Sequence, residues 1–413
     1  MSSKSDLGTY VNYAFDQIRH IIDSFGPRDP GSPGEKKAQE YIAGQLANWT
    51  DETKIEEFKV HPKAFMGFMP VSGLLLLASV GAYWLAPGAA LALSALALLI
   101  ALLQFLFYRQ FLDPFFPHRI SRNVIGIRKP AGETRRRIII SGHVDAAYEW
   151  RYFFKGGHFL LKAVIAGALL GAFGKVIIDL IYCISAGLAA GSPEGVWRIL
   201  GLVQLIFLPF FFAMIFFSDF RTVSPGANDN LTGTWAALSV MKYLHDTGTR
   251  FQNTEVRCLI TGSEEAGLRG AKAYARRHRE ELKRVETIFV GLETFRDLEH
   301  LSVYNRDMSG TVRHHDGVCS LLQRAGKRCG LDLPLASIFL GSSDAAAFSQ
   351  AGIPSGALAA MDPAPATYYH TRLDHWNNMD QECFEISLRI VLEAIRLYDA
   401  EGLGLQGKAS LPA

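Results

Sequence analysis

The stretch "VRCLITGSEEAGLRGA", Val256 to Ala271, decides the fold. An apolar run ends in two adjacent carboxylates, Glu264 and Glu265, and then in small residues. Such a run is typical of a buried strand, where a carboxylate without a partner is unstable by several kcal/mol. A bound cation would stabilise both acids. The stretch therefore predicts a metal site at the end of a buried strand, with further ligands elsewhere in the chain.

Strand-like and helical segments alternate on both sides of this stretch. Apolar, strand-like runs cover residues 123–129, 136–145, 255–262, 285–294, 300–305 and 354–361. Helical spacing covers residues 10–26, 32–49, 230–248, 267–283, 318–330 and 381–402, and Ser32, Pro33 and Glu35 form a helix-start signal. The alternation predicts an α/β fold, with a mixed, mostly parallel sheet sandwiched by helices. Ligands bind such sheets at the carboxyl ends of the strands.

The chain has 413 residues, a formal net charge of +2 and 49% hydrophobic residues, so its charge gives no reason to expect nucleic acid as a partner. The apolar excess lies in two segments. Ala64 to Tyr108 contains no charged residue and has a turn signal, "LAPGA", at its centre. Ala163 to Phe217 is interrupted by "AGSPEG". A membrane span needs about 20 apolar residues, so we expect two inserted transmembrane hairpins with about four spans. Buried helices of a large soluble protein are the alternative.

The hairpins divide the chain into three parts: a soluble domain of residues 1–63 with 109–162 and 218–413, hairpin 1 at 64–108, and hairpin 2 at 163–217. Each hairpin returns to the side it left, so all soluble segments share one side of the lipid bilayer. Basic residues gather on that side, at Lys63, Arg109, Arg119, Arg122, Arg151, Lys155, Lys162 and Arg221, whereas the opposite loops offer only Arg198. The bias predicts an integral membrane protein with its soluble domain in the cytoplasm.

The first part of hairpin 2, Ala163 to Ala190, contains two charged residues, Lys175 and Asp179, four apart on one helical face. We expect a self-neutralising pair that faces neighbouring helices, and a polar pathway through the membrane is the alternative. "GALLG", Gly167 to Gly171, matches a small-residue packing pattern that also fits ordinary close packing within the chain. The five cysteines form no paired spacing, which fits a reducing compartment.

Acidic and histidine residues lie where the predicted strands and helices end, so all of them can converge on one rim of the sheet. Two imidazoles and three carboxylates suit zinc or a similar divalent cation. The residues concerned are His143 and Asp145 in "IIISGHVD", Asp229 in "SPGANDNLTG", Glu264 and Glu265 in "CLITGSEE", Glu293 in "FVGLET", and His370 in "YYHTRLDHWNN".

This ordered set, together with "GSPGEKKAQEYIAGQL" near the start of the chain, resembles the co-catalytic di-zinc aminopeptidases of metallopeptidase family twenty-eight. The family includes bacterial leucyl aminopeptidases, glutamate carboxypeptidase and the glutaminyl cyclases. The resemblance covers almost all of the soluble domain and implies that this domain is a metallopeptidase catalytic domain. It also implies two divalent metal ions, zinc first among them, and a short peptide as substrate.

The resemblance implies a role for each site residue. His143 and Glu293 would hold one metal, Glu265 and His370 the other, and Asp229 would bridge both. Adjacent residues at a strand end point to opposite sides, so one glutamate of a pair can bind a metal while the other faces the activated water.

Two further residues complete the implied mechanism. Glu264 would be the general base that takes the proton of the water and hands it to the leaving amine. Asp145 would orient His143 from behind the metal site.

The chain departs from the family at two site positions as well as in its hairpins. Glu293 stands where many members have Asp, which leaves the metal geometry open. "GSSDAAAF", Gly341 to Phe348, has Ala345 where the family has His, which bears on substrate recognition.

For four further residues, a purely structural interpretation is open beside the functional one. His370 matches the family position better than His375, and His314 and His315 are expected to be solvated at the start of a helix. Asp374 either hydrogen-bonds near the site or shapes a turn.

The leading interpretation is a membrane-anchored, metal-dependent aminopeptidase. A glutaminyl cyclase or a carboxypeptidase of the same fold, an inactive receptor-like relative, and a transport unit built on Lys175 and Asp179 are the alternatives. Substrate specificity and oligomeric state stay open.

Overall fold

The computed structural model describes residues 7–338, 341–364 and 366–403. The chain forms two compact units. Unit 1 comprises Met1–Pro62, His118–Ala147 and Val223–Ala413, and unit 2 comprises Lys63–Pro117 and Tyr148–Thr222. From the sequence, the boundaries between the soluble domain and the hairpins were expected after residues 63, 108, 162 and 217. Unit 2 therefore includes more of the flanking chain than the predicted hairpins do.

Unit 1 is built on a nine-stranded sheet with the strand order β1-β2-β6-β3-β7-β11-β8-β10, to which β9 adds beside β8. The four inner strands β6, β3, β7 and β11 are mutually parallel, and antiparallel pairs lie on either side of them. The mixed, mostly parallel sheet predicted from the sequence is therefore present. The strands are β1 (Glu52–Val60), β2 (Arg119–Arg128), β3 (Arg136–His143), β6 (Thr254–Thr261), β7 (Glu286–Phe295), β8 (Leu301–Asp307), β9 (Val312–Arg313), β10 (Leu335–Ser337) and β11 (Ser355–Ala360).

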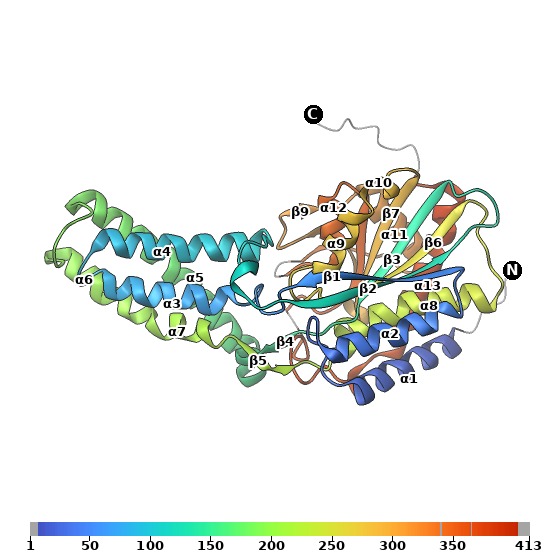
Figure 1. Ribbon diagram of the computed structural model, residues 1–413, viewed down its shortest axis with the longest axis horizontal. Coiled ribbons are helices and arrows are strands. Elements are labelled where there is room, and N and C mark those ends of the chain that lie inside the picture. Colours follow the sequence, from blue (N-terminus) through green and yellow to red (C-terminus); the bar gives the residue numbers. More distant parts are fainter. Residues whose placement is uncertain (1–6, 339–340, 365, 404–413) are drawn as a thin grey trace. The chain divides into compact units, whose positions relative to one another are not determined.

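Helices cover both faces of this sheet (Figure 1). Every residue of β6 is buried, as a strand covered on both faces requires. On one face α8 (Gly233–Asp246) packs against β3, β6 and β7, and α1 (Gly8–Phe25), α2 (Pro33–Ala47), α11 (Asp316–Arg328) and α13 (Gln381–Glu401) surround it. On the other face lie α9 (Arg269–Arg277) and α12 (Asp344–Gln350). The fully buried Trp235 of α8 lies in the main core.

The strands β1, β9 and β10 and the helix α12 were not expected from the sequence, and one expected helix is divided. The single helix expected at residues 267–283 is two helices, α9 and α10 (Arg279–Leu282), separated at His278. The His278 ring lies 2.7 Å from a Glu281 oxygen and 2.9 Å from a Glu56 oxygen, and these contacts hold its backbone outside the helical region. Glu56 belongs to β1, an edge strand that the sequence analysis did not include.

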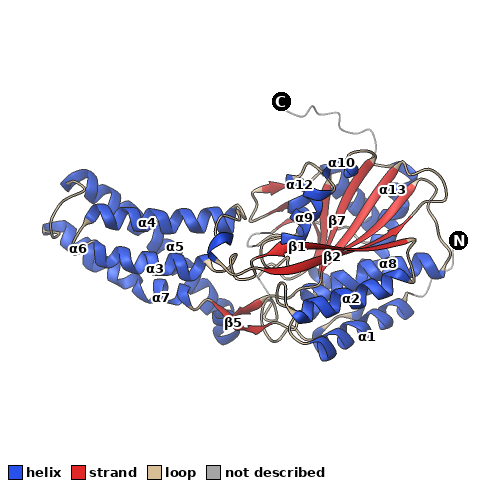
Figure 2. Cartoon of the chain, viewed as in Figure 1, coloured by secondary structure: helices blue, strands red, loops and turns tan. Residues whose placement is uncertain are grey.

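Unit 2 is helical apart from the short pair β4 (Tyr148–Trp150) and β5 (Ser218–Val223), as Figure 2 shows. Its helices are α3 (Phe68–Ala82), α4 (Pro87–Ala101), α5 (Arg151–Ala186), α6 (Gly195–Gln204) and α7 (Leu208–Ile215), with π-helical Leu102–Leu106 continuing α4 and 3-10 turns at Asp113–Phe115 and Leu205–Phe207. A break at Gly156 and Gly157 interrupts α5.

Among the described residues, three helical stretches are long and apolar enough to cross a membrane: Pro87–Leu106, Arg151–Ala186 and Gly195–Ile215. The fourth expected span, α3, is a shorter apolar helix of 15 residues. At 1.5 Å per residue it is about 22 Å long, less than the ~30 Å of a bilayer core.

The interior of unit 2 contains the charged pair expected in hairpin 2. Lys175 Nζ lies 2.8 Å from Asp179 Oδ1, and both side chains are buried. The hydroxyls of Ser94 in α4 and Ser79 in α3 lie 2.7 and 3.3 Å from Asp179 Oδ2. The prediction of a self-neutralising pair that faces neighbouring helices is confirmed.

Candidate metal centre

The chain brings the predicted ligands together through the parallel strands of unit 1. His143 is the last residue of β3, and Glu264 and Glu265 follow the end of β6. Glu293 lies near the end of β7. Because β3 is parallel to both β6 and β7, the carboxyl ends of these strands meet at one edge of the sheet. Two loops complete the group: Asp229 lies in the π-helical turn Ala227–Thr232 before α8, and His370 lies between β11 and α13.

Asp229 lies between the two imidazoles. Its Oδ1 is 3.3 Å from His143 Nε2, and its Oδ2 is 3.1 Å from His370 Nε2. His370 Nε2 is also 3.3 Å from Glu265 Oε1. His143 Nε2 lies 3.9 Å from one oxygen each of Glu264 and Glu293. His143 therefore faces three acids and His370 faces two, and Asp229 belongs to both sets.

Three groups of ligand atoms lie close enough to hold a metal ion, each with its atoms within 4.8 Å of one another. The first is His143, Asp229 and Glu293, and the second is Asp229, Glu265 and His370. The third is His143, Glu264 and Glu265. The first two groups share Asp229 and contain the five residues to which the family resemblance gives a metal. His375, the alternative to His370, is in none of the groups found among the described residues.

Burial and mutual repulsion dominate the electrostatics of the site. Burial raises the pKa of Glu264 well above its usual range, helped by Glu265 and opposed by His143. Burial also raises the pKa of Glu293 and of Glu265. The pKa of Asp229 is lowered despite its burial, because the imidazoles of His143 and His370 lie beside its oxygens and favour the charged carboxylate. Burial lowers the pKa of His370, but Glu265 and Asp229 outweigh it and raise the value to about 10. Four carboxyl groups in one buried place are a strongly cation-attracting set.

The donor atoms themselves fit a divalent metal. Asp229 Oδ2 and Glu265 Oε1 are fully buried, and neither accepts a hydrogen bond from the described residues. Buried carboxylate oxygens without hydrogen bonds are rare, since each loses its solvation without compensation. Imidazole nitrogens and carboxylate oxygens are the mixed ligand set that zinc and similar cations prefer.

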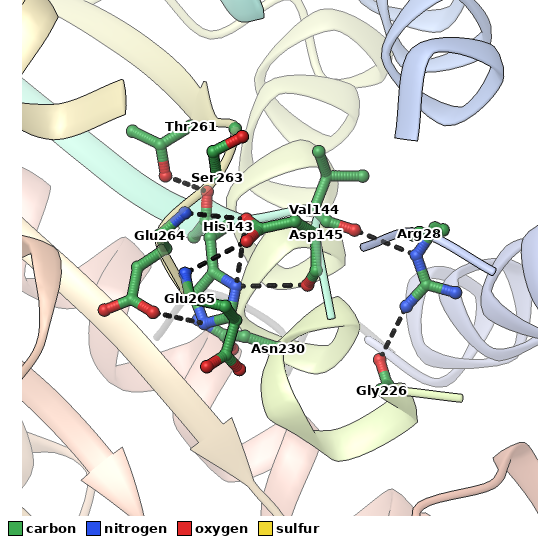
Figure 3. A network of polar contacts seen from close by, with 12 residues as sticks. Arg28, His143, Val144, Asp145, Gly226, Asn230, Thr261, Ser263, Glu264 and Glu265 are labelled. Carbon is green, nitrogen blue, oxygen red and sulfur yellow. Dashed lines mark hydrogen bonds and ion pairs between the residues drawn. The ribbon is translucent and has the colours of Figure 1, made fainter. Parts of the chain in front are cut away.

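Asp145 supports the turn that carries the two glutamates (Figure 3). Its Oδ1 accepts a hydrogen bond from Glu264 N at 2.9 Å, and its Oδ2 accepts one from Glu265 N at 3.0 Å. His143 Nδ1 lies 3.3 Å from the main-chain oxygen of Asp145 and 3.6 Å from its Oδ1. Asp145 therefore contacts both the His143 ring and the turn that carries the two glutamates. Only its contact with His143 was expected from the sequence.

Two residues without an assigned role in the sequence analysis hold the ligand loops. Asn230 Nδ2 donates to Glu293 Oε2 at 2.7 Å. Asp374 accepts hydrogen bonds from Asn228 N and Nδ2 at 2.9 and 2.8 Å, and from Asp229 N at 2.9 Å. Of the two roles expected for Asp374, a hydrogen bond near the site or the shaping of a turn, the structure shows the hydrogen bond. The proximity of Asn230 to Asp229 in the sequence was the only signal for its role.

Asp344 to Phe348, the part of the segment that has Ala345 in place of His, lies on α12 and is buried. It brings Asp344 to the end of β6, where the Asp344 carboxylate accepts a hydrogen bond from the Thr261 hydroxyl.

The expectation that His314 is solvated is wrong. Its ring is buried, with Nε2 3.1 Å from Asp307 Oδ2 and Nδ1 2.9 Å from the Ser349 hydroxyl. Because both ring nitrogens of His314 have hydrogen-bonding partners inside unit 1, the ring can be buried without loss of hydrogen bonds. His315 caps α11 through a hydrogen bond from Gly317 N.

Comparisons with known proteins bear on the family and the fold of this chain. Residues 216–395 match the profile described as Peptidase family M28. Aminopeptidase YwaD of Bacillus subtilis (strain 168) is 29% identical over 188 residues, which is 42% of this chain. The match spans only 37% of the length of that relative.

Solved structures share the fold. A zinc aminopeptidase from Bacillus subtilis superposes with a TM-score of 0.56 at 17% identity, over 97% of both chains. An aminopeptidase from Aneurinibacillus sp. strain AM-1 gives 0.57 at 16%, over 95% of this chain and 96% of that one. A glutaminyl cyclase from Bacteroides thetaiotaomicron gives 0.55 at 13%, over 93% and 97%. The mixed sheet of unit 1 is thus that of the zinc aminopeptidase fold, and the family profile and the aminopeptidase relative support a zinc-dependent hydrolase.

Proposed function

We propose that this chain is a membrane-anchored, zinc-dependent aminopeptidase that removes N-terminal residues from short peptides. The observation that carries the proposal is Asp229, whose two oxygens lie 3.3 and 3.1 Å from His143 Nε2 and His370 Nε2. A carboxylate in this place can serve two cations at once. His143 and Glu293 complete one ligand set, and Glu265 and His370 complete the other.

Divalent ions bound there supply Lewis acidity and lower the pKa of water. Glu264 is the general base: it accepts the proton of the attacking water and later donates it to the leaving amine. Burial raises the pKa of Glu264, which favours the protonated form that the second half of this exchange requires. Asp145 keeps Glu264 in place through the main chain.

Unit 2 supports the proposed membrane anchor. Large apolar side chains point outward from its long helices, with Leu170 67%, Ile184 77% and Ile206 66% exposed, whereas Lys175 and Asp179 are buried. Apolar residues outside and charges inside are the arrangement that a lipid bilayer favours. The basic flanks of the hairpins support a catalytic domain on the cytoplasmic side.

The test is metal analysis of the purified protein, combined with a panel of aminoacyl and dipeptide substrates. We expect Glu264→Gln to retain zinc and to lose turnover by at least ~10²-fold, which is the usual contribution of a general base. Glu299→Gln, a change at an exposed glutamate, is the control. Undiminished hydrolysis by Glu264→Gln would refute the assignment of the base.

A glutaminyl cyclase is the second candidate, because solved cyclases match the fold as closely as aminopeptidases do. The family resemblance gives cyclases one zinc, so metal per chain separates the two. Two zinc ions and release of an N-terminal residue support the aminopeptidase. One zinc and ring closure of an N-terminal glutamine support the cyclase. Cleavage of peptides with a blocked N-terminus would instead indicate a carboxypeptidase.

A further inference from the structure

A second buried carboxylate, Glu35, is bound to the turn that carries Glu264. Glu35 lies in the first turn of α2 and is 1% exposed. Its Oε1 accepts a hydrogen bond from Ser263 N at 2.7 Å and lies 3.1 Å from the Ser263 hydroxyl. The Ser121 hydroxyl of β2 lies 2.9 Å from both oxygens of Glu35. Gly31 N donates to Oε2 at 2.7 Å.

Helix capping does not account for these contacts. Ser32 caps α2 by itself, because its hydroxyl accepts the hydrogen bond from Glu35 N. In a capping box the glutamate side chain would bind the main-chain N–H of Ser32, but here it binds Gly31 N and reaches across to Ser121 and Ser263. A glutamate that served only the helix start would need no contact with the end of β6.

The turn at Ser263 needs outside support. Ser263 has a φ of 54°, which is the left-handed region that residues other than glycine rarely adopt. Three successive main-chain N–H groups then point to two buried carboxylates: Ser263 N to Glu35, and Glu264 N and Glu265 N to Asp145. Figure 3 shows Ser263, Glu264 and Asp145 together at this turn. The turn is thus held from two sides.

We propose that Glu35 is a positioning residue for Glu264: it fixes the Ser263 main chain and thereby aims the carboxylate of the general base. The inference rests on the proposed peptidase function. Asp145 holds Glu264 N and Glu265 N, and His370 faces Glu265. Loss of Glu35 therefore leaves the metal ligands in place and releases only the start of the turn.

The expected effect falls on turnover. A small displacement of a catalytic group lowers the rate by up to ~10²-fold, and loss of a supporting hydrogen-bond partner costs about 10- to 100-fold. We expect Glu35→Gln to lower kcat by about 10- to 100-fold while KM and zinc content stay near the wild-type values. A merely structural role would lower the yield of folded protein and leave the kcat of the folded fraction unchanged.

The experiment uses the full chain, purified in detergent and loaded with zinc, with a dipeptide substrate that the wild type cleaves. Four variants are compared with the wild type: Glu35→Gln, Glu264→Gln, the double variant, and Glu40→Gln. Glu40 is the control because it lies on α2 but is exposed, in a surface pair with Lys36. If Glu35 acts through Glu264, adding Glu35→Gln to Glu264→Gln lowers the residual activity no further.

A wild-type kcat in Glu35→Gln, or a full additional loss in the double variant, would overturn the inference and leave the proposed function standing. Absence of metal-dependent hydrolysis in the wild type would overturn the proposed function and the inference with it. Ser263→Ala is the second variant, should Glu35→Gln fail to fold. It removes only the hydroxyl contact with Glu35, so we expect a several-fold lower kcat at unchanged KM, and an unchanged kcat would count against the inference.

Discussion

At the scale of single residues, the site depends on carboxylates whose hydrogen bonds go to the main chain. Asp145 and Asp374 both accept N–H groups of ligand-bearing segments, at Glu264 and Glu265 in one case and at Asn228 and Asp229 in the other. Neither residue belongs to a possible metal-binding group found among the described residues. Asp145 also positions Glu264, the proposed general base, whereas Asp374 holds the loop that carries Asp229, so removal of Asp374 should act on metal affinity rather than on chemistry.

Asp374→Asn tests this distinction. The substituted amide places N–H groups opposite the N–H donors of Asn228 and Asp229. The loop that carries Asp229 therefore loses a hydrogen-bond acceptor. We expect a 10- to 100-fold weaker zinc affinity, measured by competition with a chelator of known affinity. Asp332→Asn, at a position 84% exposed, is the control and should bind zinc as the wild type does. Equal affinities in all three proteins would contradict the prediction.

A second residue-scale prediction concerns stability in acid. Asp51 pairs with Arg250 through both oxygens, at 2.6 and 2.8 Å, and accepts a hydrogen bond from Lys129 N. The hydrogen bonds from Arg250 lower the pKa of Asp51 to about 2. Because the folded pKa lies below the unfolded one, the stabilisation is present above pH ~4 and is lost as the pH falls from about 4 to about 2.

We expect Asp51→Asn to lower the free energy of unfolding of unit 1 by about 1 kcal/mol at neutral pH, a modest figure because the pair is partly exposed to solvent. The difference from the wild type should shrink as the pH falls through this window. Thermal unfolding between pH 2 and pH 7 measures it. Asp316→Asn, which breaks an exposed pair with Arg313, should show no such trend.

At the scale of elements, unit 2 is assembled by close contacts between helices rather than by long loops. Gly167 and Gly171 of α5 lie against the rings of Phe210, Phe207 and Phe211. A Cβ at Gly167 would lie 2.3 Å from the Phe210 ring, whereas one at Gly174 of the same helix would meet nothing within 4 Å. The small-residue pattern of α5 is therefore used for packing within this chain.

The two glycines make a matched test. We expect Gly167→Ala to destabilise unit 2 by about 1 to 3 kcal/mol through overpacking. Gly174→Ala should be neutral, or stabilising by up to ~1 kcal/mol, because alanine favours the helix. The melting temperatures of both variants in one detergent are the measurement. Equal shifts in the two would show that helix propensity, and not the contact with Phe210, decides the outcome.

Helices and strands could be predicted from the sequence where the pattern of apolar residues that specifies them is local. Apolar runs such as Ile138–Ile140 specify the inner strands, and strand ends specify where ligands such as His143 gather. The left-handed turn at Ser263, the burial of His314 and the reach of Glu35 to Ser121 depend on partners distant in the sequence. Periodicity reports which face of an element is buried, but not which buried polar atoms meet.

At the scale of the whole molecule, the side of the membrane on which the catalytic domain lies is still a prediction. Eight basic residues flank the hairpins on the side of the catalytic domain, against Arg198 on the other. The bias predicts that protease added to right-side-out vesicles leaves the C-terminal half intact. Inside-out vesicles, in which the same half should be digested, are the matched control. Digestion in right-side-out vesicles would place the domain outside the cell.

The order of the strands has a consequence for biogenesis. The central strand β3 is translated before α5, yet both of its neighbours, β6 and β7, are translated after α7. On the ribosome, β3 therefore waits without its neighbouring strands β6 and β7 while the helices of hairpin 2 are synthesised. His370, a proposed ligand, follows both hairpins in the sequence, so the proposed metal centre can be completed only after both hairpins have been synthesised.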